Sequence, residues 1–529
     1  MDIRDPKDLI RQLPALSKLT RRELIQYAVA AGFSVAATEQ LLSSPAFAEP
    51  VRGGSMRFGL SYGATTDSLD PATWSNVMGT LIFGAALTEI DSKNSVQPNL
   101  VESFEPSEGA AKWTFKLRRG LTFHDGRTVE AKDVVATYNY HRSENSKSPI
   151  KSALEQIVDI KADDSETVVF SLKSGNADFP YVTSDYHLPI FPAKDTESIE
   201  WEKGVGAGPF VLDSFEPGVR MTGKRFANYH KAGLPYFDDV SIVVIHDVTA
   251  RINALLADDI DYMDRADLKT INMLAEYPNI EIDNVTGAAH YIAVMNVTVP
   301  PFDNPDVRMA LKYAVNRDSI VEKIASGYGT VGNDSPIAPN LKYSIQPEPV
   351  HKFDPDKVKE HLKKAGLDSL KIDLSTSETA FPGAVEAALL IKDSAAKAGI
   401  DINVVVEPND GYWENVWMKK PFTMSYWGGR PTPDWMFTIA YAAGGAWNDS
   451  FWNNARFNEL LLSGRAETDE AKRAVIYSEM QQLVHDDGGA LVLMFANFVS
   501  VHSKRVSHGE LNSNYDFDGG RLFERWWKT

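Results

Sequence analysis

The sequence predicts an α/β protein with two or more lobes, and three observations lead to this fold class. Short segments with strand-like patterns are followed by segments with helical periodicity, most clearly between residues 356 and 407. The chain has 529 residues, 43% of them hydrophobic, and this length exceeds what one core usually organises. Charged residues make up 24% of the chain and both signs are mixed, which is typical of a folded protein.

In the first half, the expected strands either alternate apolar and polar residues or are rich in β-branched residues. Trp113, Phe115 and Leu117, for example, alternate with polar residues and predict a strand. The glycine-rich run 204–209 predicts a tight turn, since a phosphate-binding loop would be followed by a helix and here a strand follows. In order, we expect strands at 56–62, 113–117, 167–172, 210–212, 240–245 and 258–263, and helices at 132–140 and 249–257.

In the second half, the pattern becomes a regular alternation of strands and helices. The apolar residues of 305–326 share one face, which predicts a single amphipathic helix. Residues 490–501 are strongly apolar and predict one last strand. The other elements that we expect in this half are strands at 289–296, 371–374 and 400–407 and helices at 356–365 and 381–398.

The composition excludes several function classes. A net charge of −18 without a basic stripe disfavours binding to nucleic acid, and we take the acidity as a contribution to solubility. The absence of cysteine excludes disulfides, thiolate zinc sites and cysteine nucleophiles. The 11 histidines are scattered without a close metal spacing, so we expect no metal site and no cofactor.

The N-terminus has the parts of an export signal. Arg21 and Arg22 precede a weakly apolar stretch over 27–42, which ends in a small-x-small pattern at Ala46 and Ala48. The paired arginines and the modest hydrophobicity favour the twin-arginine route, with residues 1–48 as the signal peptide. The alternative is an ordinary amphipathic surface helix. No later stretch approaches the length of a membrane span.

The sequence shows no local signature of catalysis. It contains neither a Gly-x-Ser-x-Gly elbow nor a Ser-x-x-Lys pattern, so we expect no catalytic residues and no enzyme. A pair of glycosidase carboxylates stays open, because a sequence does not show which carboxylates converge. A binding protein is therefore the favoured class.

Several segments carry a family resemblance. The signature consists of residues 112–120 (KWTFKLRRG), 123–127 (FHDGR) and 131–134 (AKDV), and it is extended by 68–71 (SLDP), 206–210 (GAGPF), 254–261 (ALLADDID) and 301–308 (PFDNPDVR). The sequence resembles the extracellular solute-binding proteins of family 5, the peptide, nickel and opine binding proteins of ABC importers. The resemblance covers essentially the whole chain after the signal.

The resemblance implies a type II-like, Venus-flytrap periplasmic binding protein with two lobes and an extra small domain inserted in the first lobe. We expect the first lobe at 49–285 with the inserted domain at about 80–185, the second lobe at 286–490, and a return to the first lobe at 491–529. It also implies a periplasmic monomer that captures a peptide or peptide-like solute and passes it to the permease and ATPase subunits of an importer.

Residues 426–435 resemble the family's cleft loop, in which an aspartate pairs with the free amine of a peptide ligand. Alignment on the Pro-Asp pair at 433–434 puts Gly429 at that aspartate, with Arg430 beside it. One explanation is an acid from a shifted position: Asp434, Asp410 or Glu407. The other is a ligand held by its carboxylate on Arg430, such as an opine or a modified amino acid. A solvated Arg430 is the plainer alternative.

Aromatic residues crowd this half of the chain and offer rigid walls for a ligand. They are Tyr412, Trp413, Trp417, Tyr426, Trp427, Trp435, Trp447 and Trp452, each of which can instead belong to the core. The complete set of candidate ligand contacts is Tyr62, Thr65, Met78, Trp427, Gly429, Arg430, Asp434, Trp435, Phe495 and Asn497. A ligand sensor or a secreted hydrolase on the same scaffold, and carriage of a metal or haem complex, are the remaining alternatives.

Overall fold

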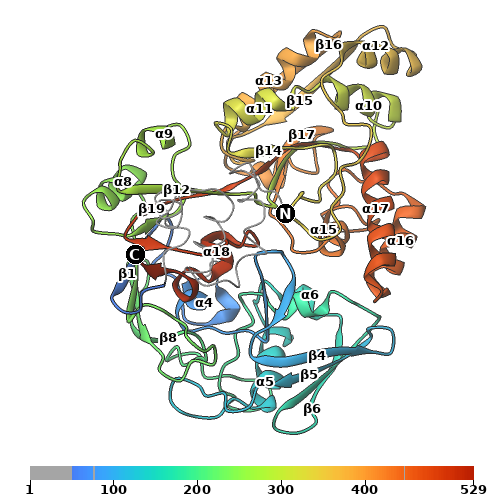
Figure 1. The fold of residues 1–529 in the computed structure, drawn as a ribbon. Helices are drawn as coiled ribbons and strands as arrows, with labels where there is room; N and C mark the ends of the chain where they lie inside the picture. The colour runs from blue at the N-terminus through green and yellow to red at the C-terminus, as the bar shows by residue number, and fades with distance from the viewer. Residues whose placement is uncertain (1–49, 75–77, 446) are drawn as a thin grey trace, which may run out of the picture.

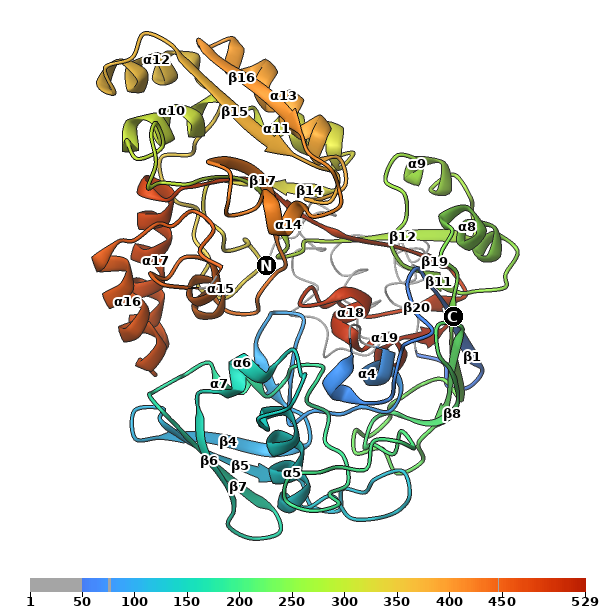
Figure 2. The same cartoon turned by 180° about the vertical axis from the view of Figure 1, so that it is seen from behind.

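The computed structural model describes residues 50–74, 78–445 and 447–529. The predicted signal over 1–48 lies outside these residues. Figures 1 and 2 show a molecule of two lobes joined by long strands, with a further small sheet below the first lobe. None of the described helices combines the length and the apolar character that a membrane span requires.

The first lobe is built on a seven-stranded mixed sheet with the order β12-β19-β11-β1-β10-β9-β8. Its strands are β1 (Ser55–Leu60), β8 (Phe210–Glu216), β9 (Arg220–Arg225), β10 (Asp239–Val244), β11 (Tyr262–Met263), β12 (Ile280–Val285) and β19 (Phe498–Ser503). Around it lie η2 (Pro71–Thr73), α4 (Met78–Ile82), α8 (Val248–Leu256), α9 (Ile271–Leu274), α18 (Asp516–Gly520), α19 (Leu522–Arg525) and the pairs β2 (Thr88–Ile90) with β3 (Val96–Pro98) and β20 (Val506–Ser507) with β21 (Trp527–Lys528).

A separate four-stranded antiparallel sheet of order β4-β5-β7-β6 forms the small domain below. It contains β4 (Val101–Ser107), β5 (Lys112–Leu117), β6 (Ile157–Ala162) and β7 (Thr167–Leu172), with α5 (Ala131–Arg142), α6 (Lys151–Leu154) and α7 (Phe179–Val182). The alternation read from β5 places Phe115 inward, where its ring packs against those of Phe170 and Phe179 at centroid distances of 5.3 and 6.1 Å. This small domain therefore has its own core.

The second lobe is built on a six-stranded sheet with the order β14-β18-β13-β17-β15-β16. Its strands are β13 (His290–Met295), β14 (Gly329–Val331), β15 (Leu370–Thr376), β16 (Ile400–Val406), β17 (Phe422–Trp427) and β18 (Ala490–Ala496). Its helices are α10 (Pro305–Ala314), α11 (Arg317–Ile324), α12 (Pro355–Lys364), α13 (Ala384–Ala396), α14 (Tyr412–Asn415), α15 (Pro433–Ala440), α16 (Ala455–Ala466) and α17 (Glu470–Asp487).

Two of the expected elements are wrong in their extent. The helix expected over 305–326 is two helices, α10 and α11, because Val315 is extended and the Asn316 side chain caps α11 by accepting from the Ser319 amide. The strand expected over 490–501 is also two strands, and they belong to different lobes. Since β18 pairs with β13 and β14, the chain returns to the first lobe after Ala496 and not at 491.

The lobes are joined twice, between β12 and β13 and between β18 and β19. β19 pairs antiparallel with β12, and β18 pairs antiparallel with β13, so both connections run side by side. Figures 1 and 2 show these strands bridging the two lobes. Two adjacent strand crossings form a hinge about which lobes can close on a ligand.

Candidate ligand-binding site

Three neighbouring cavities lie between the lobes. A cavity of about 460 Å³ is lined from the first lobe by 185–187 and 514–516, from the small domain by 149–153, and from the second lobe by 428–431, Trp435, Ile439 and Trp447. Neighbouring cavities of about 500 and 330 Å³ share lining residues with it and continue between the small domain and the second lobe. Volumes of this size are typical of small-molecule sites.

The cleft loop 428–432 is fixed at both ends. β17 ends at Trp427, and α15 begins at Pro433 with Thr432 as its cap, whose hydroxyl accepts from the Trp435 amide at 3.3 Å. Gly429 packs against the hinge, since a Cβ there would lie 2.6 Å from the Cβ of Ala288 and 2.9 Å from its carbonyl carbon. An aspartate at this position would therefore not fit without a movement of backbone.

Arg430 lies on this loop, is half-buried and lines the cleft cavity. One guanidinium nitrogen donates to the carbonyl oxygens of Gly428 and Gly429 at 2.9 and 3.1 Å. It has no carboxylate partner within ion-pair distance among the residues that the structure describes. Burial lowers the pKa of the guanidinium, because the charged form is partly removed from water.

Asp516 approaches the same cavity from the opposite lobe. It opens α18, a turn whose residues Phe517, Asp518 and Gly519 have left-handed backbone angles. Asp518 holds this turn by accepting from the Asn512 amide at 2.7 Å and from Arg525 at 2.8 Å. Asp516 itself forms no ion pair or hydrogen bond within the described part of the chain, and burial raises its pKa to about 6.

The other carboxylates of the cleft already have partners. Asp434 accepts from Arg465 at 3.1 Å, and Asp178 pairs with Arg473 at 2.7 Å. Asp185 accepts from the imidazole of His187 at 2.6 Å. Arg430 and Asp516 therefore differ from their neighbours, because each lines the cavity without an ion pair to another described residue.

Some of the aromatic residues line the cavity, and others belong to the hydrophobic core. Trp435 and the half-exposed Trp447 line the cavity from the second lobe, and Tyr186 and Tyr515 line it from the first, with their rings 5.7 Å apart. Trp427, the candidate that loop position favours most, is only 5% exposed and donates its indole N–H to a buried carboxylate, so it belongs to the core beneath the cavity.

The structure also places the remaining candidates. Phe495 and Met78 are core residues, 3% and 4% exposed, and do not line the cleft cavity. Thr65 lies in an exposed loop, and Tyr62 packs under the guanidinium of Arg265 at 4.7 Å, both outside the lining of this cavity. Asn497 lines a smaller cavity of about 170 Å³ that also contains Asp516.

The two alternative acids of the second lobe are also outside the cavity lining. Glu407 accepts from the Ser375 hydroxyl at 2.9 Å, and Asp410 is exposed at the start of α14. Sequence reasoning thus identifies Gly429, Arg430 and Trp435 as cavity residues and misses Asp185, Tyr515 and Asp516. No local pattern marks these three, because only the fold brings the end of the chain to the cleft.

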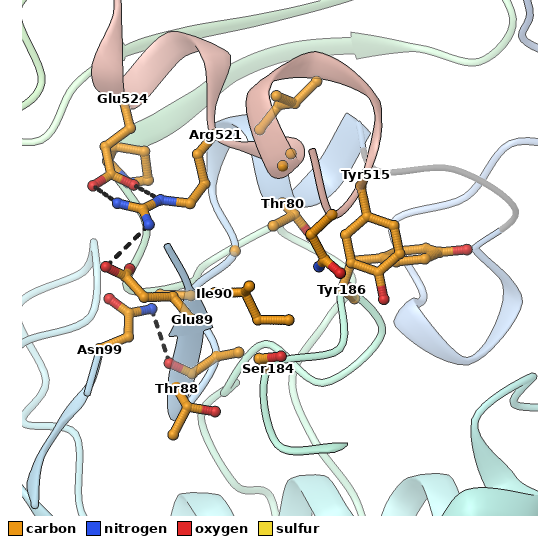
Figure 3. Close-up of a pocket in the computed structure, with 18 of the residues that line it drawn as sticks. Thr80, Thr88, Glu89, Ile90, Asn99, Ser184, Tyr186, Tyr515, Arg521 and Glu524 are labelled. Carbon is orange, nitrogen blue, oxygen red and sulfur yellow. Dashed lines mark hydrogen bonds and ion pairs between the residues drawn. The ribbon is translucent and has the colours of Figure 1, made fainter. Parts of the chain in front are cut away.

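A second, smaller cavity in the first lobe does not suit a ligand. It has a volume of about 60 Å³ and is lined by charged groups that pair with one another (Figure 3). Arg521 lies between Glu89 and Glu524, at 3.0 Å from an oxygen of each. This network is structural, since its charges are already compensated.

Comparison with known proteins identifies the family of this chain. A model of the bacterial extracellular solute-binding proteins, family 5, matches residues 95–449. The chain belongs to this family. Its members are binding proteins of ABC importers that work in the periplasm or outside the cell, and the lobes, hinge and cleft described above are those of such a two-lobed α/β protein.

Three relatives show how the family-5 fold recurs. The glutathione-binding protein GsiB of Escherichia coli K12 is 25% identical over 469 residues, which are 85% of this chain and 90% of GsiB. HbpA2 from Haemophilus parasuis has a TM-score of 0.80 at 20% identity, covering 90% of this chain and 100% of HbpA2. The PBP AgaA of A. tumefaciens R10, solved in complex with agropinic acid, has a TM-score of 0.71 at 25% identity, covering 90% and 99%.

Proposed function

We propose that this family-5 protein captures a small zwitterionic solute, such as a short peptide or an amino-acid conjugate, and delivers it to the permease of an ABC importer. The observation that carries this proposal is the placement of two opposite charges, Arg430 and Asp516. They lie on opposite lobes and line one cavity, and neither forms an ion pair with any residue that the structure describes. A ligand with a carboxylate and an amine would supply a partner to each.

Arg430 fits a ligand carboxylate. Its remaining N–H groups are free to form charge-assisted hydrogen bonds, and a guanidinium matches a carboxylate with two parallel bonds. A partly buried cation without a counter-charge is costly, and a bound carboxylate would offset that cost. The cleft loop of this chain therefore binds the acidic end of the ligand where peptide binders of the resembled pattern place an aspartate.

Asp516 fits a ligand amine. It is none of the three acids considered from the sequence, since it comes from the C-terminal segment and lines the cavity from the first lobe. An ammonium group within hydrogen-bond distance would stabilise its charged form. The rings of Tyr186, Tyr515 and Trp435 would cover the apolar part of the ligand between the two ends.

The relatives support both the size and the acidity of such a ligand. GsiB is named for glutathione, and AgaA was solved with agropinic acid. Because the two charges of this cleft lie on different lobes, a ligand that touches both favours the closed arrangement of the hinge. Export through the twin-arginine route and a monomeric state belong to the same proposal.

Isothermal titration calorimetry of the chain with four probes tests the proposal. The probes are glutathione, a dipeptide, its N-acetyl form and its C-terminal amide. We expect both modifications of the dipeptide to weaken binding, since each removes one charge. Arg430→Met and Asp516→Asn should each weaken binding of the free peptide by roughly 10- to 100-fold, as loss of about 1.5–3 kcal/mol per charged hydrogen-bonding group implies.

Arg119→Met and Asp356→Asn are matched controls, because both side chains are exposed. Equal affinity for all four probes, or equal loss in the controls, would contradict the proposal. Binding that needs only the carboxylate would instead favour an opine or another acidic solute, for which Arg430 alone is required. Product formation from any probe would show a hydrolase.

A further inference from the structure

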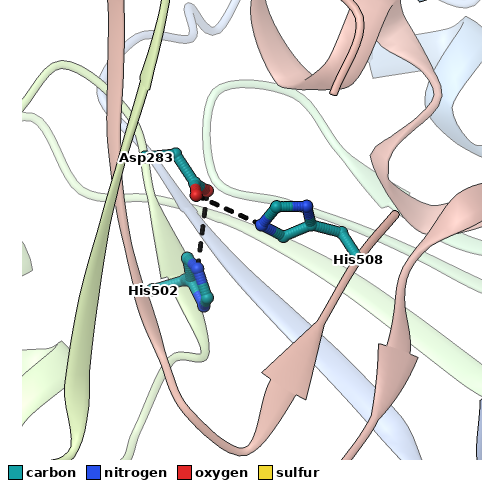
Figure 4. A group of neighbouring side chains, drawn as sticks. All are labelled: Asp283, His502 and His508. Atoms are coloured by element: carbon teal, nitrogen blue, oxygen red, sulfur yellow. Dashed lines mark hydrogen bonds and ion pairs between the residues drawn. The ribbon is translucent and has the colours of Figure 1, made fainter. Parts of the chain in front are cut away.

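Asp283, His502 and His508 converge in the first lobe (Figure 4). None of them lines the cleft cavity. Asp283 lies on β12, where it pairs with Ser500 of β19. His502 lies two residues further along β19, opposite Glu281, and His508 follows β20. Asp283 is 225 residues from His508 along the chain, so no sequence spacing indicates the cluster. Asp283 and His502 are buried, and His508 is half-buried.

The three ligand atoms have the separations of a metal site. Nε2 of His502 lies 3.4 Å from one oxygen of Asp283, and Nε2 of His508 lies 3.1 Å from the other. One atom from each of the three residues falls within 4.8 Å of both others. Ligands bound at about 2.0–2.1 Å to a tetrahedral ion are about 3.3 Å apart, which is close to these values.

Both histidines are oriented by the nitrogen that faces away from the cluster. Nδ1 of His502 lies 3.1 Å from the Ser503 carbonyl oxygen, and Nδ1 of His508 lies 2.7 Å from that of Gly509. A carbonyl can only accept, so in each neutral ring the proton is on Nδ1 and the Nε2 lone pair points at Asp283. This is the outer-shell arrangement that fixes metal-binding histidines.

If both imidazole rings are neutral, the cluster contains three hydrogen-bond acceptors, namely the two Nε2 atoms and the carboxylate, and no donor. Nε2 of His502 is buried and makes no hydrogen bond, although it lies beside the carboxylate. Either protons on the rings or a cation must compensate the carboxylate.

We propose that Asp283, His502 and His508 bind a divalent transition-metal ion of the zinc type. Two imidazoles and one carboxylate are a ligand set that such ions prefer, and solvent beside the half-buried His508 can supply a fourth ligand. The ion would tie β12 to β19 and to the C-terminal segment. These two strands continue into the hinge crossings, so the ion would brace the first-lobe side of the hinge.

Titration of the full chain, without a polyhistidine tag and after chelation, with Zn²⁺ alone tests this site. We expect one ion per chain by calorimetry and by elemental analysis, and an increase in melting temperature with zinc concentration. Asp283→Asn and His508→Gln should weaken zinc binding at least tenfold, since loss of an outer-shell partner alone costs 10- to 100-fold. His361→Gln is the matched control, because His361 pairs with Asp306 in the second lobe at 2.8 Å.

Co²⁺ gives a second readout that does not depend on a variant. Binding at this site should produce visible absorption bands of a four-coordinate ion in the unmodified protein, and Zn²⁺ should abolish them. Circular dichroism verifies that each variant is folded. Absence of a stoichiometric ion in the unmodified chain, or equal zinc affinity in Asp283→Asn, His508→Gln and the control, would overturn the proposal and leave a proton-bridged cluster.

Discussion

Acidification should weaken ligand binding through Asp516. Burial raises the pKa of this carboxyl to about 6, with Arg265 lowering it in part and Asp264 raising it further. An ammonium ligand needs the charged form of Asp516, so affinity is highest above pH 6 and falls as the pH drops through 6. Replacement by Asn removes the titrating group while keeping its size.

The size of the effect follows from the fraction of Asp516 that is ionised. With a pKa of about 6, that fraction is about 97% at pH 7.5 and about 9% at pH 5. The dissociation constant of the bound peptide should therefore rise about tenfold between these two conditions. The ligand's own groups change this ratio by less than about twofold. An α-carboxyl stays ionised across this range, and an α-amine with a pKa of about 7.7–8.0 is already mostly protonated at pH 7.5.

Calorimetry of the tightest-binding probe at pH 7.5, 6 and 5 measures the change. Asp516→Asn should bind more weakly at pH 7.5 and show a flatter profile. Asp434→Asn provides the comparison within the cleft, since burial also raises the pKa of Asp434 to about 6 while Arg465 already pairs with it. A flat profile for the unmodified protein, or the same slope in Asp516→Asn, would refute the role of Asp516.

Three further predictions concern stability. Gly429→Ala should destabilise the protein by about 1–3 kcal/mol, because the new Cβ would lie 2.6 Å from that of Ala288. Asp449→Asn should stabilise the protein more at pH 8 than at pH 5: burial raises the pKa of Asp449 to about 7, so its charged form, present at high pH, opposes folding. Arg317→Met should lower the free energy of unfolding by about 3–5 kcal/mol, since it removes the guanidinium nitrogen that donates to both oxygens of the buried Asp334, at 2.7 and 2.9 Å.

Urea denaturation measures all three changes. Gly509→Ala is the control for the first, because a Cβ there meets open space, and equal stability of Gly429→Ala and this control would contradict the steric argument. For Asp449→Asn, a difference from the unmodified protein that does not grow between pH 5 and pH 8 would contradict the burial of charge. A loss below 1 kcal/mol in Arg317→Met would show that the pair is not required.

Much of the fold follows from patterns that the sequence carries locally. Alternation predicts β5 and β7, and the strand–helix repeat predicts the second-lobe sheet, because both depend on residues close in the chain. The break between α10 and α11 also has a local signal, since asparagine is one of the residue types preferred at a helix N-cap and Asn316 caps α11. The switch of lobes at Asn497 has none, because apolar residues continue on both sides of it.

The site is predicted only in part, for a physical reason. Arg430 is found because its loop has a recognisable pattern, and its lack of a partner becomes visible only in the folded chain. Trp427 is misplaced in the sequence analysis, since an aromatic residue at the end of a strand looks the same whether its ring faces solvent or a buried Asp449. Asp516 is missed because it is far from the cleft loop 428–432 in the sequence, and only the fold brings both to the same cavity.

The position of β19 within the first-lobe sheet has a consequence for the order of folding. β19 lies between β12 and β11, so β12 has no neighbour in this sheet until residues 498–503 have been synthesised. Because synthesis begins at the N-terminus, the residues of the second lobe are made before the last strands of the first lobe. The first lobe therefore reaches its final form only after the last strand of the second lobe, β18, has been synthesised, and an export route that carries folded proteins would receive the chain after that stage.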